Sequence, residues 1–236
     1  MRVLISFLVG AATAGSFAQP SLDSGSSRPA RAATHSVHWE QLTLGDAVER
    51  LKAVSGAAIV LDRRVDPDER INLSLRDASV DDVIARLSAV CSLGHIRIET
   101  LFYMGPREVA ERLPTLAIER RREIFQLPAD QRRGLVERRR IVWPRLSEPR
   151  GLIVRLVQEH GWRVEHSERI PHDLWPAGEL PKLALTDQLT ILLAGFDRTY
   201  RISPERQAIE IVPVDWDQME PTAAPARMNR DRKSVV

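Results

Sequence analysis

The chain has 236 residues, of which 43% are apolar and 28% are charged, and its formal net charge is only +2. This apolar content is enough to build a packed core, so a chain that is disordered over its full length is excluded. The small net charge argues against nucleic acid as the default partner. A single cysteine, Cys91, excludes an internal disulfide framework and a multi-cysteine metal site.

Residues 1–18 have the pattern of a secretory signal peptide. Arg2 supplies a positive charge, residues 3–12 form an apolar run, and Ser16 and Ala18 place small residues where a signal peptidase cuts. The apolar run is shorter than the roughly 20 residues that a membrane-spanning helix needs, and a buried N-terminal helix is the alternative. We therefore expect an exported protein, periplasmic or associated with the cell envelope, without a transmembrane span in the mature chain.

Two polar stretches flank the central part of the chain. Residues 19–36 are rich in Ser, Ala, Pro and Gly, which is typical of a flexible leader. Residues 215–236 are dominated by Pro, Ala, Arg and Asp, and we predict a disordered tail there. The folded part is therefore expected between these two stretches.

The central part repeats itself at a constant offset of 105 residues. Leu51 corresponds to Leu156 and Gly56 to Gly161, and further apolar positions continue the same register without a gap. Two copies are too few for a solenoid, so the pattern indicates a duplicated domain. We place the first copy at residues 37–104, the second at 142–214, and a linker at 105–141.

Apolar periodicity and helix caps predict the elements of the first copy. Thr43 with Asp46, and Ser79 with Asp82, form the capping boxes that start two helices, and Gly56 ends the first of them. Alternating apolar and polar residues mark the strands. The predicted elements are a strand at 37–42, a helix ending at Gly56, strands at 58–61 and 71–75, a helix at 80–90, and a strand at 95–103.

The second copy follows the same order with weaker signals. Its predicted elements are a helix ending at Gly161, a loop with three prolines at 170–181, a helix at 186–195, and a hairpin of strands at 199–202 and 208–212. Each copy should pack two helices against small sheets. The predicted fold class is therefore α+β, with two duplicated small β-α-β-β-α-β domains joined by a basic, mainly helical linker.

At these residues the chain resembles a known family. LTILLAGFDRTYRI (189–202) followed by AIEIVP (208–213) is similar to the end of the secretin and TonB amino-terminal short domain, and INLSLRDASVDDVIARLSAV (71–90) resembles the same module. The segment IPHDLWPAGELP (170–181) is similar to one shared by exported proteins of planctomycete-type bacteria. The resemblance implies a periplasmic docking element that precedes an outer-membrane pore or receptor and contacts a protein partner.

The linker is rich in arginine. From Arg120 to Arg140 there are eight Arg and three acidic residues. Arg120, Arg121 and Arg122 are therefore candidate partner-binding residues, and an anionic surface is a candidate contact for the linker. The alternative is a solvated helix whose arginines pair with nearby glutamates at helical spacing. Aromatic residues do not interleave with the arginines, so we predict no nucleic-acid binding.

Trp175 is the remaining candidate for partner binding. It lies in the sequence HDLWP, and an exposed Trp beside prolines suits a binding hot spot. The alternative is a plug that packs over the core of a small domain. In the first interpretation a partner covers the Trp175 ring, and in the second the ring packs on the core of its own chain.

Motifs for catalysis or metal binding are not evident. His160, His166 and His172 recur every six residues, a spacing that does not place them on one face of a helix or strand. Cys91, at the end of a predicted helix, fits a small buried apolar residue better than a nucleophile. We therefore predict no catalytic residue, no metal site and no cofactor.

Two classes of function remain. The first is a non-catalytic protein-interaction module that binds an envelope protein through the edges of its sheets. The alternative is an envelope enzyme, such as a cell-wall hydrolase, with a site between the two copies. An enzyme would need polar side chains that converge in a pocket, for example His172, Asp173 or Glu179 facing His160 or His166.

Overall fold

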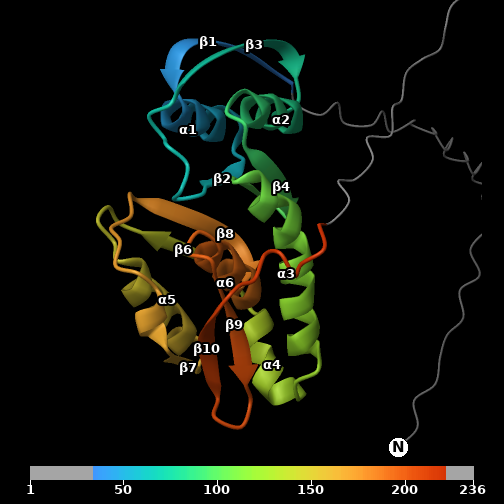
Figure 1. The fold of residues 1–236 in the computed structure, drawn as a ribbon, viewed down its shortest axis with the longest axis vertical. Coiled ribbons are helices and arrows are strands. Elements are labelled where there is room, and N and C mark those ends of the chain that lie inside the picture. Colours follow the sequence, from blue (N-terminus) through green and yellow to red (C-terminus); the bar gives the residue numbers. More distant parts are fainter. Residues whose placement is uncertain (1–33, 222–236) are drawn as a thin grey trace, which may run out of the picture. The chain divides into compact units, whose positions relative to one another are not determined.

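The computed structural model describes residues 34–221 of the chain (Figure 1). The predicted signal peptide and most of the predicted leader lie outside the described residues. Helices and short strands are interspersed along the described chain, and the strands form small sheets. The α+β class predicted from the sequence is therefore confirmed.

The first half contains two helices and five strands. Its elements are β1 (His35–Thr43), α1 (Leu44–Ser55), β2 (Ala58–Leu61), β3 (Arg70–Ala78), α2 (Val80–Val90), β4 (Gly94–Ile98) and β5 (Leu101–Gly105). β1 pairs with β3 in an antiparallel two-stranded sheet. The other sheet has the strand order β2-β5-β4, in which β5 runs parallel to β2 and antiparallel to β4.

The second half has the same order of strands and helices, with one added 3-10 turn. Its elements are β6 (Arg138–Trp143), α5 (Pro149–Glu159), β7 (Arg163–Glu165), η1 (Ser167–Arg169), β8 (Gly178–Ala184), α6 (Leu185–Ala194), β9 (Arg198–Ser203) and β10 (Ala208–Pro213). β6 pairs with β8 antiparallel. β10 lies between β7, to which it is parallel, and β9, to which it is antiparallel. Each pairing in the first half therefore has a counterpart in the second.

The caps that the sequence predicts start the helices of the first half. Thr43 Oγ1 accepts a hydrogen bond from the Asp46 N–H at 3.2 Å, and Ser79 Oγ accepts one from the Asp82 N–H at 3.2 Å. Each hydroxyl satisfies one of the backbone donors that a helix leaves unpaired at its start. Local sequence therefore determines where α1 and α2 begin.

Two helices, α3 (Arg107–Phe125) and α4 (Ala129–Val136), connect the halves. One face of α3 is buried, and its buried residues are Val109, Ala110, Leu113, Leu116, Ala117 and Ile124. α3 approaches β4 closely, because a Cβ placed on Gly94 would lie 2.7 Å from the Ala110 Cβ. The predicted linker is thus largely helical, and its first helix belongs to the core.

The two apolar cores share one sheet. The first core lies around α1, α2 and the β1–β3 sheet, and it includes Phe102 and Met104 of β5. The second core includes Leu101 and Tyr103 of the same strand, together with α3 and the apolar residues of the second half. Neighbouring residues of a strand point to opposite faces of the sheet. β5 therefore contributes to both cores, and every residue of it is buried.

Two predicted elements differ from the structure. The single strand predicted at 95–103 is a hairpin, because Glu99 adopts a left-handed backbone (φ 54°) and turns β4 back onto β5. The loop predicted at 170–181 ends earlier, where β8 begins at Gly178. Proline has no backbone N–H to donate to a neighbouring strand. Pro181 is tolerated in β8 because this strand pairs with β6 alone among the described strands, so its other edge makes no hydrogen bonds to a strand.

Residues 215–221, which the sequence places in the disordered tail, pack against the folded part. Trp216 is buried. The Thr115 hydroxyl donates to the Glu220 carbonyl at 2.9 Å, and Arg112 Nε donates to the Met219 carbonyl at 3.1 Å. Side chains of α3 therefore hold this segment through the segment's backbone carbonyl groups. None of the helices within residues 34–221 has the length and apolar character that a membrane crossing requires.

Candidate functional site

Two of the three candidate arginines on α3 are engaged inside the molecule. Arg120 exposes only 12% of its side chain, and its Nη1 donates to the Tyr200 carbonyl at 2.7 Å and lies 3.0 Å from the Glu123 carboxylate. Arg121 Nε donates to the buried Asp187 carboxylate at 2.8 Å. That hydrogen bond raises the pKa of Arg121. Both arginines therefore hold α3 against the second half.

The other two candidates differ in accessibility. Arg122 is exposed, and it forms no hydrogen bond or ion pair with any other residue of the described part of the chain. Trp175 is half-buried, and its ring stacks on that of Phe196 with centroids 5.8 Å apart and an interplanar angle of 13°. Its Nε1 donates to Asp173 Oδ2 at 3.1 Å. Of the four candidates, Arg122 is thus the most available to a partner.

A buried ionic cluster, which was not predicted from the sequence, lies where the two halves meet. Asp62 directly follows β2 and is 3% exposed. Arg64 donates to both carboxylate oxygens, with Nε 2.9 Å from Oδ1 and Nη2 2.8 Å from Oδ2. The Tyr103 hydroxyl also donates to Oδ2. Gly105 leaves room for this contact, because a Cβ there would lie 2.8 Å from the Asp62 Cβ.

The cluster fixes the protonation state of its members. Burial alone would raise the pKa of Asp62, since desolvation disfavours a carboxylate. Hydrogen bonds from Arg64 and Tyr103 outweigh burial and hold the pKa of Asp62 below its usual range. The bond to Asp62 raises the pKa of Arg64, and burial raises the pKa of Tyr103. At neutral pH the cluster is therefore a hydrogen-bonded ion pair with a protonated phenol.

Arg64 also contacts residues in the second half of the chain. Its Nη1 lies 2.6 Å from Asp197 Oδ1, and its Nη2 donates to the Ala194 carbonyl at 3.1 Å. Ala194 is the last residue of α6, so the guanidinium also complements the negative end of that helix. Asp197 Oδ1 accepts a further hydrogen bond from Trp216 Nε1 at 2.8 Å. The cluster thus ties the end of β2 to the end of α6.

Arg63 forms a second bridge beside the first. Its Nε lies 2.7 Å from Asp173 Oδ2, and its guanidinium carbon lies 4.8 Å from the centre of the Phe196 ring. Phe196 stacks on Trp175, and the centroid of the Trp175 ring lies 5.8 Å from that of Trp143. Two adjacent arginines of the first half are thus bound by acids and an aromatic ring of the second half.

The histidines that an enzyme could use lie in separate surroundings. His160 is buried, and its Nδ1 lies 2.8 Å from a carbonyl oxygen of the helix that it caps. His166 faces Glu168 at 3.1 Å, and His172 lies 3.9 Å from Glu148. Within residues 34–221, no group of three His, Cys, Asp or Glu side chains is placed to hold a metal ion.

Other reactive side chains are occupied or protected. Asp173 is bound by Arg63, and Glu179 forms an ion pair with Arg140. Cys91 is buried, and this burial raises its pKa to about 11. A thiol with that pKa is almost entirely protonated at neutral pH, so Cys91 is a poor nucleophile.

The β1–β3 sheet has open edges. Both strands are nine residues long, and no other strand of the described residues pairs with either of them. One face packs on the first core, whereas His38, Ser74 and Arg76 are exposed. A hollow of about 400 Å³ lies beside the opposed residues His38 and Ser74. This sheet therefore offers unpaired backbone groups next to a concave surface.

Two outer strands of the other sheets are covered. α3 packs against β4 and β9, each of which is one of the two outer strands of a three-stranded sheet. On β9, Arg120 occupies the carbonyl of Tyr200. A partner strand thus has less access to these edges than to the β1–β3 sheet.

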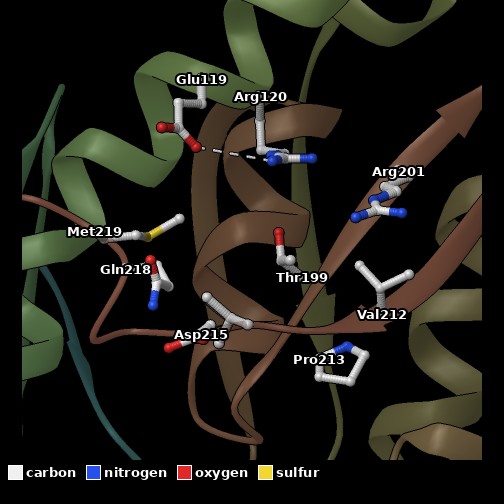
Figure 2. Close-up of a pocket in the computed structure, with 10 residues that line it drawn as sticks. Glu119, Arg120, Thr199, Arg201, Val212, Pro213, Asp215, Gln218 and Met219 are labelled. Carbon is white, nitrogen blue, oxygen red and sulfur yellow. Dashed lines mark ion pairs between the residues drawn. The ribbon is translucent and has the colours of Figure 1, made fainter.

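A cleft of about 270 Å³ lies between α3, β9 and the chain that follows β10. Figure 2 shows the residues that line it. Arg120 and Arg201 line it together with Glu119 and Asp215, so charges of both signs meet there. Thr199 Oγ1 and Arg120 Nε are buried and have no hydrogen-bond partner within residues 34–221. Because both atoms are buried, the cleft does not present them to a ligand, and its lining has no excess of either charge that would select an ion.

No protein-family model and no curated protein matches the chain, so its function is inferred from this geometry. The described residues present a bonded ionic cluster between the halves, dispersed histidines, and a long two-stranded sheet with open edges. That sheet is the feature best suited to bind a partner.

Proposed function

We propose that this chain is a non-catalytic, exported protein-interaction module that binds an envelope protein at the β1–β3 sheet. A partner strand would pair with the edge of β1 or β3 through its backbone, and alternate side chains would give selectivity. One observation carries the proposal: the two longest strands of the described chain pair only with each other among the described strands.

The repeat and the resemblance support this proposal. We infer that residues 37–104 and 142–214 are two copies of a unit similar to the secretin and TonB amino-terminal short domain. The same strand pairing in both halves, and a positive φ at both Gly56 and Gly161, are what a duplication would leave. The resemblance implies docking to a protein partner, which agrees with an open sheet edge.

The alternative of an envelope hydrolase has less support. Its site was expected between the two copies, where acid and base groups should meet in a cleft. At that place Asp62 and Asp173 are each bound by an arginine, and the Phe196 ring packs against Arg63. Groups that are paired in this way are held in position, which favours a structural role.

Export is the part of the proposal that concerns the N-terminus. Cleavage after Ala18 would give a mature chain that begins at Gln19. Mass spectrometry of the protein isolated from an envelope fraction should identify Gln19 or a neighbouring residue as the N-terminus. An intact Met1 in a cytosolic fraction would contradict export.

Site-specific crosslinking tests strand docking. A photo-crosslinking amino acid in place of His38, which is exposed on β1, should give one discrete protein adduct in intact cells. The same amino acid in place of Glu111, which is exposed on α3, is the matched control and should not give that adduct. The adduct then reports contact at the β1–β3 sheet rather than general exposure.

Proline substitutions on β3 ask whether the contact uses the strand backbone. Backbone N–H groups alternate between the paired edge and the open edge of an edge strand. Of the two variants Ser74→Pro and Leu75→Pro, one therefore removes an N–H that pairs with β1, and the other removes an N–H on the open edge. The second variant is the one whose urea midpoint is unchanged, because it leaves the pairing with β1 intact. If β3 is the docking edge, that variant should lose the adduct, and the corresponding pair on β1 should be tested in the same way. Retention of the adduct in every stable proline variant, or turnover of cell-wall material that is lost in His172→Ala, would contradict the proposal.

A further inference from the structure

The free face of α3 combines apolar and basic side chains. Ile118, Arg122 and Phe125 are spaced by four and three residues, so they lie on one face of the helix. Ile118 is 51% exposed and Phe125 is 66% exposed, and Arg122 is also exposed. Two large apolar side chains thus protrude beside a cation on one face of the helix.

α4 places Arg132 next to this face, and a second arginine follows it in the chain. The Arg132 guanidinium carbon lies 5.7 Å from the centre of the Phe125 ring, and its Nη1 donates to the Phe125 carbonyl at 3.2 Å. Arg133, the next residue, is exposed in the last turn of α4. We call Ile118, Arg122, Phe125, Arg132 and Arg133 the α3–α4 corner.

The acidic residues around the corner leave it positively charged. Glu119 and Glu123 on α3 lie 3.8 Å and 3.0 Å from Arg120 and are paired there. Glu137, just after α4, lies 2.8 Å from the arginine two positions later and is paired with it. Asp130, in the first turn of α4, is the remaining acid of the two helices near the corner. Since one guanidinium balances one carboxylate, Arg120 neutralises one of its two glutamates. Within the described residues, the three arginines of the corner therefore face the other glutamate and Asp130, and an excess of one positive charge remains.

We propose that the α3–α4 corner binds the surface of an anionic lipid membrane. Arginine guanidinium groups pair with lipid phosphates, and a protruding aromatic or aliphatic side chain enters the boundary between headgroups and acyl chains. A bilayer accepts Phe125 and Ile118 without a preformed pocket, whereas an acidic protein would need one that matches them. This contact is independent of strand docking at the β1–β3 sheet, which uses other residues.

Vesicle binding by the full chain, as isolated from its cells, tests this inference. Vesicles of phosphatidylcholine with a quarter phosphatidylglycerol should sediment the protein, and vesicles of phosphatidylcholine alone should bind it much less. Each surface arginine contributes roughly fivefold to partitioning onto an anionic membrane. The double variant R122E/R133E should therefore lower the partition coefficient by at least about 25-fold. Added salt should weaken the binding of the wild-type protein to the anionic vesicles, because it screens the charges.

The control has the same change in net charge at another place. Arg50 and Arg86 are exposed on α1 and α2, so R50E/R86E alters the total charge equally and leaves the corner intact. It should retain binding to within a few-fold of the wild type. Phe125→Ser should weaken binding, whereas Val54→Ser, at another exposed apolar residue, should not. An unchanged urea midpoint shows that each variant is folded.

Three results would overturn the inference. Equal losses in the two double variants would show a response to net charge alone. Equal binding to vesicles with and without phosphatidylglycerol would place the contact outside the basic corner. If neither kind of vesicle sediments the wild-type protein, the corner does not bind a membrane. An acidic protein would then be the partner to test.

Discussion

Gly56 and Gly161 lie 105 residues apart and both adopt a left-handed backbone, with φ of +68° and +78°. Gly56 directly follows α1, and Gly161 follows α5 after His160. A side chain other than that of glycine is strained in this region, because its Cβ approaches the following carbonyl. The two glycines therefore end equivalent helices by the same means.

Alanine at either glycine should destabilise the protein through the backbone. A Cβ at Gly56 would meet nothing within 4 Å, and one at Gly161 would meet only Gln207 Nε2 at 4.0 Å. The free energy of unfolding should fall by about 1–2 kcal/mol in each variant, the cost of a left-handed conformation for an L residue. Urea denaturation measures this loss.

Gly151→Ala is the matched control for these variants. Gly151 lies inside α5, and a Cβ there would be 4.0 Å from its nearest neighbour, Glu148 Oε2. Alanine should stabilise the helix by up to about 1 kcal/mol. Equal effects at Gly56 and Gly151 would show that the left-handed backbone is not the cause.

Acid should weaken the contact between the halves through Asp62. Although burial opposes the shift, hydrogen bonds lower its pKa in the folded protein, whereas an unfolded Asp has a pKa of about 3.9. The folded state therefore binds this proton less well than the unfolded state. The stability that Asp62 contributes is present above about pH 4 and is lost as the pH falls through the lower folded-state pKa.

Asp62→Asn isolates this contribution. At pH 7 the substitution should lower the free energy of unfolding by about 1–3 kcal/mol, since it weakens the hydrogen bonds from Arg64 and Tyr103 while Asp197 still pairs with Arg64. Urea midpoints measured from pH 7 to pH 3 should fall less steeply in the variant than in the wild type. Parallel profiles would assign the acid sensitivity to other carboxylates.

Cys91 should react slowly in the folded protein. Burial raises its pKa to about 11 and also shields the sulfur from the reagent. At pH 7.5, alkylation by iodoacetamide should be at least about 100-fold slower in the folded protein than in urea-unfolded protein. Mass spectrometry follows the modification, and similar rates in both states would contradict a buried thiol.

The first half should not fold alone. In a fragment of residues 34–105, Leu101 and Tyr103 lose the apolar cover that α3 and the second half provide. This fragment should lack a cooperative urea transition and should bind a hydrophobic dye, whereas residues 34–221 should unfold in one step. A sharp transition for the fragment would show that the shared sheet is stable without its second cover.

Sequence predicted what is decided locally. The caps at Thr43 and Ser79 depend on residues three positions away, and apolar periods locate most helices and strands. Arg120 pairs with Glu123 within the same helix, as the local alternative predicts. The partner of Arg121 is Asp187, 66 positions later in the chain, and no local pattern indicates such a contact.

The ionic cluster was missed for the same reason. Asp62 and Arg64 look like ordinary surface charges in the sequence, and their burial depends on residues far along the chain, such as Tyr103 and Asp197. The hairpin at Glu99 lacks the glycine that usually marks such a turn, so the strand was predicted to continue. Tertiary contacts, rather than local preference, decide these features.

The sheet that serves both cores also constrains how this chain can evolve. A repeat that only stacks on its neighbours can be gained or lost as a unit. Here the removal of either half would uncover one face of β5, so selection acts on both halves together. A change of charge at Arg64 would likewise call for a matching change at Asp197 on the other side of the junction. In descendants of this chain we therefore expect both halves to be retained and these two positions to vary together.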